Sequence, residues 1–455
     1  MNKKRIIIFI SLETYLRNWI AAGAFDEINQ THDILYVIPK YDWDSVEIES
    51  FGIKNYVVIN QKKWRMFFFR KILLITMIRF SKRSYAFRVK TSNFRNSLSK
   101  NLYKLLSKGA IYHSFLFLSK MLLGRWNEIS KIYNEFEPDL VIAPSLAADS
   151  FTIGMTYSAN LHKIKSLILI NSWDNLVSKG VMPIQPSFIG LWGQQSIRHA
   201  LEIQQIPMSK LKILGVPRFE SYFKKAESEF SIHDINGIPR DKKILLYPST
   251  VLPFNDIEAL TILDNELNTN PDYKDYVILF RSHPEMMSRN NEISVLEAGL
   301  KNIYLDVQTA DFYLSRFKKK GDTSFGSSIN KTSLDYYPSL LKSVSGLVCP
   351  ATTLSLEGLL NGKPCVMLCY DDGEGYFLSA SKVAKFENVQ EVLSMSGVYP
   401  VYEKDNLLQN FRIMVDSLKD QKRSKEIIEA TREVVFRDDQ NYSERLSDFV
   451  NSIIE

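Results

Sequence analysis

Residues 346–368 read Gly346-Leu-Val-Cys-Pro-Ala-Thr-Thr-Leu-Ser-Leu-Glu-Gly-Leu-Leu-Asn-Gly-Lys-Pro-Cys-Val-Met-Leu368. The apolar run that ends at Cys349 predicts a buried strand, and the polar turn after it starts a helix that stops before a second strand. Thr352, Thr353 and Ser355 stand at the helix start, where unpaired backbone amides attract anions. This order predicts a parallel βαβ unit with a phosphate-binding end. The alternative is an ordinary βαβ unit whose helix is capped by threonines.

Strands alternate with helices along the rest of the chain. A helix is expected over residues 16–29, and another where the polar turn at Thr352 begins. Such alternation predicts parallel pairing in an α/β fold, with two Rossmann-like, doubly wound domains facing across a cleft. The strands are expected at residues 5–10, 32–39, 55–59, 140–143, 165–170, 188–192, 211–214, 243–247, 276–280, 302–306, 347–349 and 365–369.

The same pattern predicts the domain limits. The first domain covers residues 1–217 and carries a basic helical insertion at about 61–126, and residues 218–240 form a charged linker. The second domain covers residues 241–422. The helices of residues 423–455 either close the second domain or cross back to the first.

Polar residues follow the predicted strands of the second half. Ser249 and Thr250 come after one strand, and Arg281-Ser-His283 comes after the next. Ligands of open α/β sheets bind at the carboxyl ends of the strands. These side chains are therefore candidates to bind the phosphates of a donor, and Glu357, one turn into its helix, is the candidate for a ribose hydroxyl.

Carboxylates in the first half are candidates for a general base. Glu13, Asp149 and Asp174 are expected on the cleft side, and Asp174 is preferred because it follows a strand end. The alternative is that Asp174 forms an Asx-type turn or cap. Asp42-Trp-Asp44 imitates a metal-binding Asp-x-Asp but is interpreted as a solvated loop, so no metal is predicted. Asp371-Asp-Gly-Glu-Gly375 is a weaker candidate to contact the base or sugar.

Composition excludes other classes of protein. The 455 residues suffice for two or three domains with their own cores. The three cysteines (Cys349, Cys365 and Cys369) fall in or beside predicted strands, which indicates reduced thiols and a cytoplasmic location. The apolar run near the N-terminus is too short for a signal peptide, and no segment is apolar enough to span a membrane. No cofactor is predicted.

Basic residues are concentrated in residues 50–127, here called the basic block. It contains 17 Lys or Arg and no Asp or Glu, which leaves the rest of the chain net acidic. Long aliphatic and aromatic runs between the cations suit the headgroup layer of an anionic membrane better than nucleic acid. The alternative is that these helices pack in a domain core with a solvated basic rim.

Four motifs carry a resemblance to the GT-B glycosyltransferases. Leu214-Gly-Val-Pro-Arg-Phe-Glu220 is similar to the Gly-x-Pro-x-Phe-Asp that opens the second domain in one branch of that family. Arg281-Ser-His-Pro284 resembles its Arg-x-His-Pro, and Thr352-Thr-Leu-Ser-Leu-Glu357 with Gly362-Lys-Pro364 resembles its Ser-Ser/Thr-x-x-x-Glu and Gly-x-Pro. Ser172-Trp-Asp-Asn-Leu-Val-Ser-Lys-Gly180 resembles a segment of surface-polysaccharide transferases. The resemblance covers about residues 165–370.

That branch includes nonhydrolysing UDP-N-acetylglucosamine 2-epimerases, CDP-glycerol glycerophosphotransferases and bacterial sialyl- and Kdo-type transferases. The resemblance implies a metal-independent transferase that moves a sugar from a UDP- or CMP-linked donor to a cell-surface glycan. Combined with the basic block, it predicts a peripheral enzyme on the inner face of the plasma membrane, acting on a lipid-linked acceptor. An isomerase of the epimerase type, a CDP-glycerol-type phosphotransferase and a noncatalytic binding protein are the alternatives.

Overall fold

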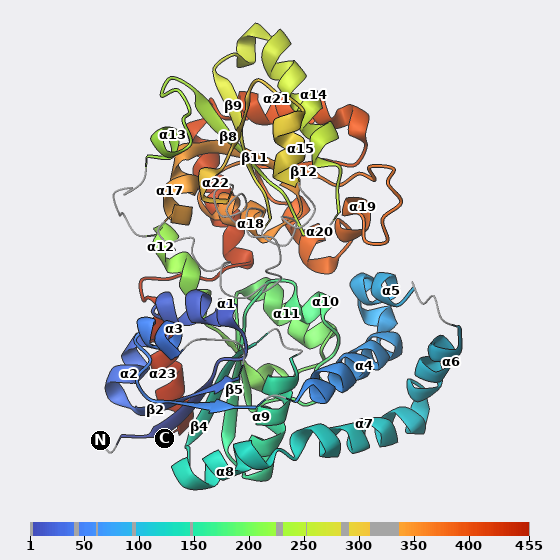
Figure 1. Ribbon diagram of the computed structural model, residues 1–455, viewed down its shortest axis with the longest axis vertical. Coiled ribbons are helices and arrows are strands. Elements are labelled where there is room, and N and C mark those ends of the chain that lie inside the picture. The colour runs from blue at the N-terminus through green and yellow to red at the C-terminus, as the bar shows by residue number, and fades with distance from the viewer. Residues whose placement is uncertain are drawn as a thin grey trace. The chain divides into compact units, whose positions relative to one another are not determined.

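The computed structural model describes residues 3–40, 45–60, 62–92, 97–145, 149–223, 231–251, 253–283, 291–309 and 336–454. The chain forms two compact units, each with its own parallel sheet (Figure 1). The first unit is Met1–Glu220 together with Arg432–Glu455, and the second is Ser221–Thr431.

The first unit contains a seven-stranded sheet in the order β3-β2-β1-β4-β5-β6-β7. Every neighbouring pair in it is parallel. The order reverses between β1 and β4, which places the topological switch point there. The strands are β1 (Arg5–Phe9), β2 (Asp33–Pro39), β3 (Tyr56–Ile59), β4 (Leu140–Ser145), β5 (Lys165–Ile170), β6 (Phe188–Leu191) and β7 (Leu211–Ile213).

Both faces of this sheet are buried. Ile6 and Ile8 of β1 belong to one apolar cluster, while Ile7 and Phe9 belong to another, because successive side chains of a strand point to opposite faces. The first cluster includes α23 (Tyr442–Ile454), and the second includes α8 (Asn127–Phe136) and α9 (Ser150–Leu161). The unit is therefore doubly wound, as the sequence predicts.

The helix expected over residues 16–29 is not continuous, and this expectation is wrong. The segment forms α1 (Glu13–Tyr15), a π-helical turn η1 (Leu16–Ala21) and α2 (Asp26–Thr31). Gly23, at φ +71°, separates the last two. A residue with a side chain is strained in this left-handed conformation, and its Cβ would lie 2.6 Å from Asp26 Oδ2.

The basic block supplies helices between β3 and β4. The long ones are α4 (Lys63–Arg79) and α7 (Gly109–Gly124), and the shorter ones are α5 (Tyr85–Ser92) and α6 (Ser97–Leu106). In Figure 1 they extend beyond the sheet on the side of α9. Phe69, Ile72 and Leu123 pack together with Ile153 of α9, so one side of this helical group is a true core.

The second unit has a six-stranded parallel sheet in the order β10-β9-β8-β11-β12-β13. This is the Rossmann order, with its switch point between β8 and β11. The strands are β8 (Lys243–Pro248), β9 (Tyr276–Arg281), β10 (Ile303–Leu305), β11 (Val344–Pro350), β12 (Cys365–Leu368) and β13 (Val398–Val401). Two Rossmann-like, parallel α/β domains, as predicted from the sequence, are confirmed. The three cysteines are buried and free.

Helices cover this sheet and complete the unit. Leu260 and Leu263 of α14 (Asp256–Thr269) and Phe411 of α21 (Leu407–Ser417) share a core with Leu245 and Tyr247 of β8. The other helices named below are α12 (Glu220–Phe223), α13 (Ile232–Ile235), α17 (Tyr336–Ser343), α18 (Thr353–Leu360) and α22 (Gln421–Ala430).

The C-terminal segment belongs to both units. α22 packs against α18 in the second unit, whereas α23 packs in the core of the first. Arg445 of α23 holds this connection in the first unit, because its guanidinium donates to the carbonyl of Leu214 and pairs with Glu220 at 2.7 Å. Residues 423–455 were expected either to close the second domain or to cross back to the first. α22 does the former and α23 the latter.

Candidate functional site

Polar residues follow three neighbouring strands of the second unit. Ser249 and Thr250 follow β8, His283 follows β9, and Thr352 follows β11. β8 is paired with both β9 and β11, so the carboxyl ends of these three strands are adjacent at the switch point. The structure thus brings together residues that lie about 100 positions apart in the sequence.

Ser249 fixes the backbone of His283. The backbone amide of His283 donates to Ser249 Oγ at 2.8 Å, and the amide of Ser249 donates to the carbonyl of Arg281 at 2.9 Å. Burial, reinforced by the positive charge of Arg281, lowers the pKa of His283 to about 4. The imidazole is therefore neutral at physiological pH, and one ring nitrogen carries a hydrogen that it can donate.

Arg281 is a buried member of an internal network. Its guanidinium donates to the Asp306 carboxylate, whose side chain is fully buried, and to Tyr337 Oη at 3.0 Å. Burial alone disfavours the charge, but Asp306 outweighs it and raises the pKa of Arg281. The Asp306 carboxylate also accepts from Tyr336 Oη at 2.8 Å and from the amide of Gln308 at 3.1 Å. Arg281 therefore supports the strand end on which His283 stands.

The start of α18 has the geometry of a capped helix. Thr352 has extended backbone angles, and its amide donates to Ser355 Oγ at 3.4 Å while that hydroxyl donates to the Thr352 carbonyl at 2.6 Å. The capping interpretation left open by the sequence therefore describes the pair correctly. A capped helix start also presents the amides of its first turn, and with them the positive end of the helix dipole, toward an anion. Thr353 occupies the first helical position there.

Glu357 lies inside α18 and is only 6% exposed. One of its carboxylate oxygens accepts a hydrogen bond from Tyr222 Oη, a residue of α12 in the same unit. Tyr222 was not predicted as a site residue, because its short segment carries no motif that indicates this contact. The tyrosine fixes the carboxylate one turn beyond the helix start.

Two further buried acids were missed. Asp306 directly follows β10, so the same strand-end argument that selected Ser249 could have selected it. Asp256 begins α14 and accepts from Tyr247 Oη at 3.0 Å. Burial raises the pKa of Asp256 to about 7, and Asp372 adds to that effect. Asp372 itself accepts from the Asn255 amide at 2.9 Å, which ties the residues after β12 to the start of α14.

Asp174 occupies a polar network in the first unit. Its carboxylate accepts from Ser172 Oγ at 2.8 Å and Ser178 Oγ at 2.6 Å, and Lys179 Nζ lies 3.8 Å away. Burial alone would raise the pKa of Asp174, but Lys179, the two hydroxyls and Lys90 lower it. The carboxylate is therefore an anion at neutral pH. It occupies the position before the short helix α10 (Asn175–Ser178), but its side chain makes no capping hydrogen bond to that helix.

The other two candidate bases are placed at neighbouring strand ends. Asp149 precedes α9 and caps it, because its carboxylate accepts from the amide and hydroxyl of Thr152, both at 2.7 Å. Glu13 follows β1 at the start of α1. β1, β4 and β5 are neighbours in the sheet, so the backbone positions of all three candidates lie along one edge.

Several predicted features lie outside the described residues. They are Asp42 and Asp44 of the Asp-x-Asp segment and Pro284 of the Arg-x-His-Pro motif. Within the described ranges, no three or more His, Cys, Asp or Glu residues are grouped so that they could hold a metal ion. Searched over the same ranges, the helices include none with the length and apolar character needed to cross a bilayer.

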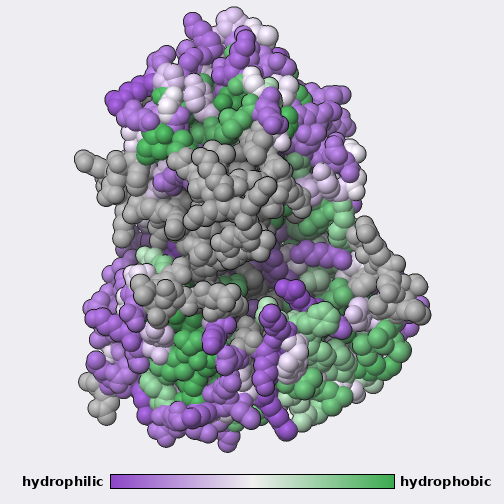
Figure 2. All heavy atoms as spheres, in the orientation of Figure 1, coloured by the Kyte–Doolittle hydropathy of each residue, from purple (hydrophilic) through white to green (hydrophobic). Residues whose placement is uncertain are grey.

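The basic block exposes large apolar side chains next to its cations. Phe67 of α4 is 63% exposed, and Phe117 and Leu118 of α7 are 62% and 63% exposed. Figure 2 shows hydrophobic atoms gathered over α4, α6 and α7 at the lower right. Within the described part of the chain, no Lys or Arg of residues 62–125 forms an ion pair with a carboxylate. This surface therefore combines exposed apolar side chains with positive charges that no ion pair among the described residues neutralises.

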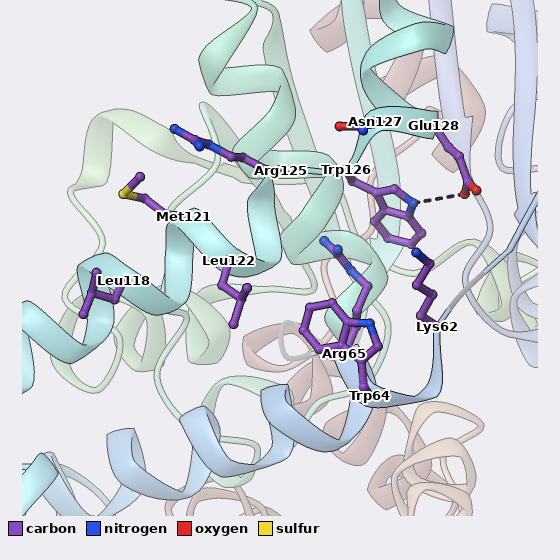
Figure 3. A pocket seen from close by; sticks show the side chains of 10 residues that line it. All are labelled: Lys62, Trp64, Arg65, Leu118, Met121, Leu122, Arg125, Trp126, Asn127 and Glu128. Atoms are coloured by element: carbon purple, nitrogen blue, oxygen red, sulfur yellow. Dashed lines mark hydrogen bonds between the residues drawn. The ribbon is translucent and has the colours of Figure 1, made fainter.

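A cavity of about 650 Å³, here called the tryptophan pocket, opens between α4 and α7 (Figure 3). Arg65 lies between two indole rings, with its guanidinium carbon 5.3 Å from the Trp64 ring centre and 4.5 Å from that of Trp126. The guanidinium also donates to the carbonyl of Leu123. Leu118, Met121 and Leu122 extend along α7 beside it. The remaining lining residues are Lys62, Arg125, Asn127 and Glu128.

Comparison with known proteins identifies the fold but no close relative. No protein-family model matches the sequence, and a search of curated proteins finds no match. Among solved structures, the UDP-N-acetylglucosamine 2-epimerase from Neisseria meningitidis bound to UDP-GlcNAc is similar, with a TM-score of 0.55 and 13% identity over 99% of this chain and all of that one. The similarity to a glycosyltransferase from Rickettsia africae ESF-5 gives a TM-score of 0.53 and 12% identity over both whole chains.

The glycosyltransferase of kitacinnamycin is a third neighbour, with a TM-score of 0.53 and 8% identity over the full length of both chains. At such identities the likeness concerns the fold alone. The chain therefore has a GT-B-like fold, and its structural neighbours are glycosyltransferases and UDP-N-acetylglucosamine 2-epimerases, as the motifs predicted.

Proposed function

We propose that the protein is a metal-independent glycosyltransferase that moves a sugar from a UDP- or CMP-linked donor to a cell-surface glycan. The observation that carries the proposal is the adjacency of His283, Ser249, Thr250 and the α18 start at the switch point of a Rossmann-type sheet. Nucleotides bind at this place in such sheets. Structural neighbours that bind UDP-GlcNAc or UDP support the same class of ligand.

The donor chemistry follows from these groups. Cleavage of the bond between sugar and phosphate leaves negative charge on the nucleotide phosphate, and fixed donors in a dry site stabilise that charge. The neutral imidazole of His283 supplies a hydrogen bond there, and the first-turn amides of α18 supply others. Arg281 positions the strand end through its hydrogen bond to the buried Asp306 carboxylate. The Glu357 carboxylate, which Tyr222 holds in place by a hydrogen bond, accepts a hydrogen bond from a ribose hydroxyl.

Asp174 is proposed as the group that accepts the proton of the acceptor hydroxyl. It stands after β5, next to the end of β4 and two strands from β1 at the same edge of the sheet, and its carboxylate is ionised at neutral pH. The hydroxyls of Ser172 and Ser178 orient it. Glu13, which follows β1 at the same edge of the sheet, is the second candidate.

An epimerase is the second candidate function, because solved UDP-N-acetylglucosamine 2-epimerases share the fold over the whole chain. The two reactions differ in their products. We would incubate the protein with a panel of UDP- and CMP-sugars, with and without glycan acceptors, and measure both free nucleotide and sugar isomers. Acceptor-dependent nucleotide release supports a transferase. Interconversion of the nucleotide sugar without an acceptor would establish an epimerase and overturn the proposal.

Replacement of Glu357 by alanine should weaken nucleotide binding more than it slows turnover at saturating donor. A ribose contact is made equally in the ground and transition states, so its loss raises KM and leaves kcat nearly unchanged. A hydrogen bond to a charged group is worth about 1.5–3 kcal/mol, which corresponds to roughly 10–100-fold in affinity. Calorimetric titration with UDP and CMP measures it. Tyr222→Phe is the matched control, which keeps the carboxylate and should lose less; unchanged affinity in Glu357→Ala would remove Glu357 from the site.

The basic block is proposed to hold the enzyme on an anionic membrane, at the inner face of the plasma membrane. Its exposed Phe and Leu side chains adjoin cations that, among the residues the structure describes, form no ion pair with a carboxylate, and each such cation near an anionic surface contributes about 1 kcal/mol. Trp64, which lines the tryptophan pocket and is 44% exposed, adds an indole ring, and indole rings favour the interface between water and lipid. The acceptor on such a surface would be lipid-linked.

Sedimentation with vesicles tests this association. The protein should sediment with vesicles that contain anionic lipid and not with neutral ones, and less of it should sediment as salt increases. Phe117→Ser with Leu118→Ser should reduce the bound fraction several-fold, because two exposed anchors are lost. Leu161→Ser is the control, since Leu161 is 57% exposed in the same unit but outside the block. No sedimentation of the unmodified protein at low salt would contradict the proposal.

A further inference from the structure

A second cavity in the first unit, of about 380 Å³, combines three cations with an apolar wall. The lining residues are Arg70, Leu73, Leu74 and Met77 of α4, Lys90 of α5, and Ser178 and Lys179. This cavity is here called the lysine pocket. It is lined by different residues from the tryptophan pocket, and it directly adjoins Asp174 through Lys179.

The lysine pocket is built by packed and hydrogen-bonded elements. Lys90 Nζ donates to the carbonyl of Ser178 at 2.7 Å, and the Gln204 amide donates to the carbonyls of Leu176 and Gly180. Gly180, at φ +99°, lies against α4, where a Cβ would sit 3.2 Å from Thr76 Oγ1. The segment that carries Lys179 is thus held close to α4 and α5.

The charges of the lysine pocket are not balanced. Its cations are Arg70, Lys90 and Lys179, and the adjacent carboxylate is Asp174, which already accepts from two serine hydroxyls. Burial, followed by repulsion from Lys179, lowers the pKa of Lys90 to about 8, and Asp174 opposes this only in part. A half-buried ammonium held next to another cation is destabilised unless an anion joins it.

We propose that the lysine pocket binds the phosphate of a hydrocarbon phosphate ester. The acceptor of the enzyme is then a sugar that is linked through this phosphate to a lipid, and the sugar lies toward Asp174. The phosphate meets Arg70, Lys90 and Lys179, and the first part of the hydrocarbon chain lies on Leu73, Leu74 and Met77. Both chemistries are present in one cavity beside the proposed base. The inference rests on the proposed transferase function, to which it adds the class of the acceptor.

Binding of dodecyl phosphate, below the concentration at which it forms micelles, tests the proposal without any need for turnover. Calorimetry at pH 7, where Lys90 is protonated, should give saturable binding with one site per chain. Lys90→Met and Arg70→Met should each weaken it by roughly tenfold or more, because each removes a charge-assisted contact. Lys82→Met is the matched control, which removes the same charge from an exposed residue that does not line the pocket.

Two comparison ligands separate the contributions of charge and hydrocarbon chain to binding. Inorganic phosphate, which lacks the chain, and dodecyl maltoside, which lacks the charge, should each bind far more weakly. Equal affinity for dodecyl phosphate in the unmodified protein and in Lys90→Met would overturn the proposal, as would equal binding of dodecyl maltoside. The UDP affinity of Lys90→Met should stay unchanged. If the unmodified protein binds dodecyl phosphate but turns over no nucleotide sugar, the transferase function is contradicted and the lipid-phosphate site is retained.

Discussion

His283→Ala is expected to lower kcat for sugar transfer by about 10²–10³-fold, with little change in stability. The imidazole is proposed to donate a hydrogen bond to the phosphate as it gains charge, and loss of one such donor costs about 2.7–4 kcal/mol in the transition state. The backbone amide of His283, which donates to Ser249, is kept in the variant. Initial rates of nucleotide release at saturating donor measure the effect.

The pH dependence of kcat/KM gives a second measure of the same residue. Because the pKa of His283 in the free protein is about 4, below its ordinary value of 6.5, the imidazole stays neutral from pH 5 to 8. Its titration should produce no step in kcat/KM over that range. By linkage, the unfolded chain takes up a proton between pH 6.5 and 4 that the folded chain does not, so this group reduces stability as the pH falls through that window. His283→Ala should abolish that contribution.

His233→Ala is the matched control for His283→Ala. His233 lies in the same unit but contacts the carbonyl of Lys242, at the amino end of β8, away from the strand ends of the site. It should leave kcat unchanged. Turnover of His283→Ala close to that of the control would remove His283 from the mechanism.

Asp306→Ala is expected to destabilise the second unit by about 3–5 kcal/mol, because it leaves the buried Arg281 guanidinium without its counter-ion. The same change removes the acceptor of Tyr336 Oη and of the Gln308 amide. Asp306→Asn should lose less, since it retains hydrogen-bond acceptors. Denaturant unfolding, with hydrogen exchange to assign the transition to the second unit, measures the loss.

Asp234→Ala provides the comparison for the buried pair. Asp234 accepts two hydrogen bonds from Arg240, at 3.1 and 2.7 Å, in an ion pair that is largely exposed. Water and salt screen such a pair, so its loss should be much smaller than that of Asp306. If both variants lose the same free energy of unfolding, the buried Arg281–Asp306 pair stabilises the strand end no more than an exposed ion pair does.

Local patterns in the sequence were enough to predict the class of fold and the polar strand ends. Apolar runs of strand length, each followed by a polar turn and a helix, predict parallel pairing because only such crossovers connect parallel strands. Thr352 and Ser355 were recognisable at a helix start because capping depends on neighbours three residues apart. Such signals depend on short stretches of chain, which a single sequence displays directly.

Contacts between distant segments were decided only by the tertiary structure. The order β9-β8-β11 brings His283 next to Ser249 and Thr352, although sequence order does not determine which strands become neighbours. Arg281, predicted to bind phosphate, has a carboxylate partner in Asp306, and Lys90 approaches Asp174 from the basic block. Charge and periodicity describe what a residue can do. Burial and the partners supplied by distant segments determine its pKa and its role, because desolvation and Coulomb energies depend on distances that arise only on folding.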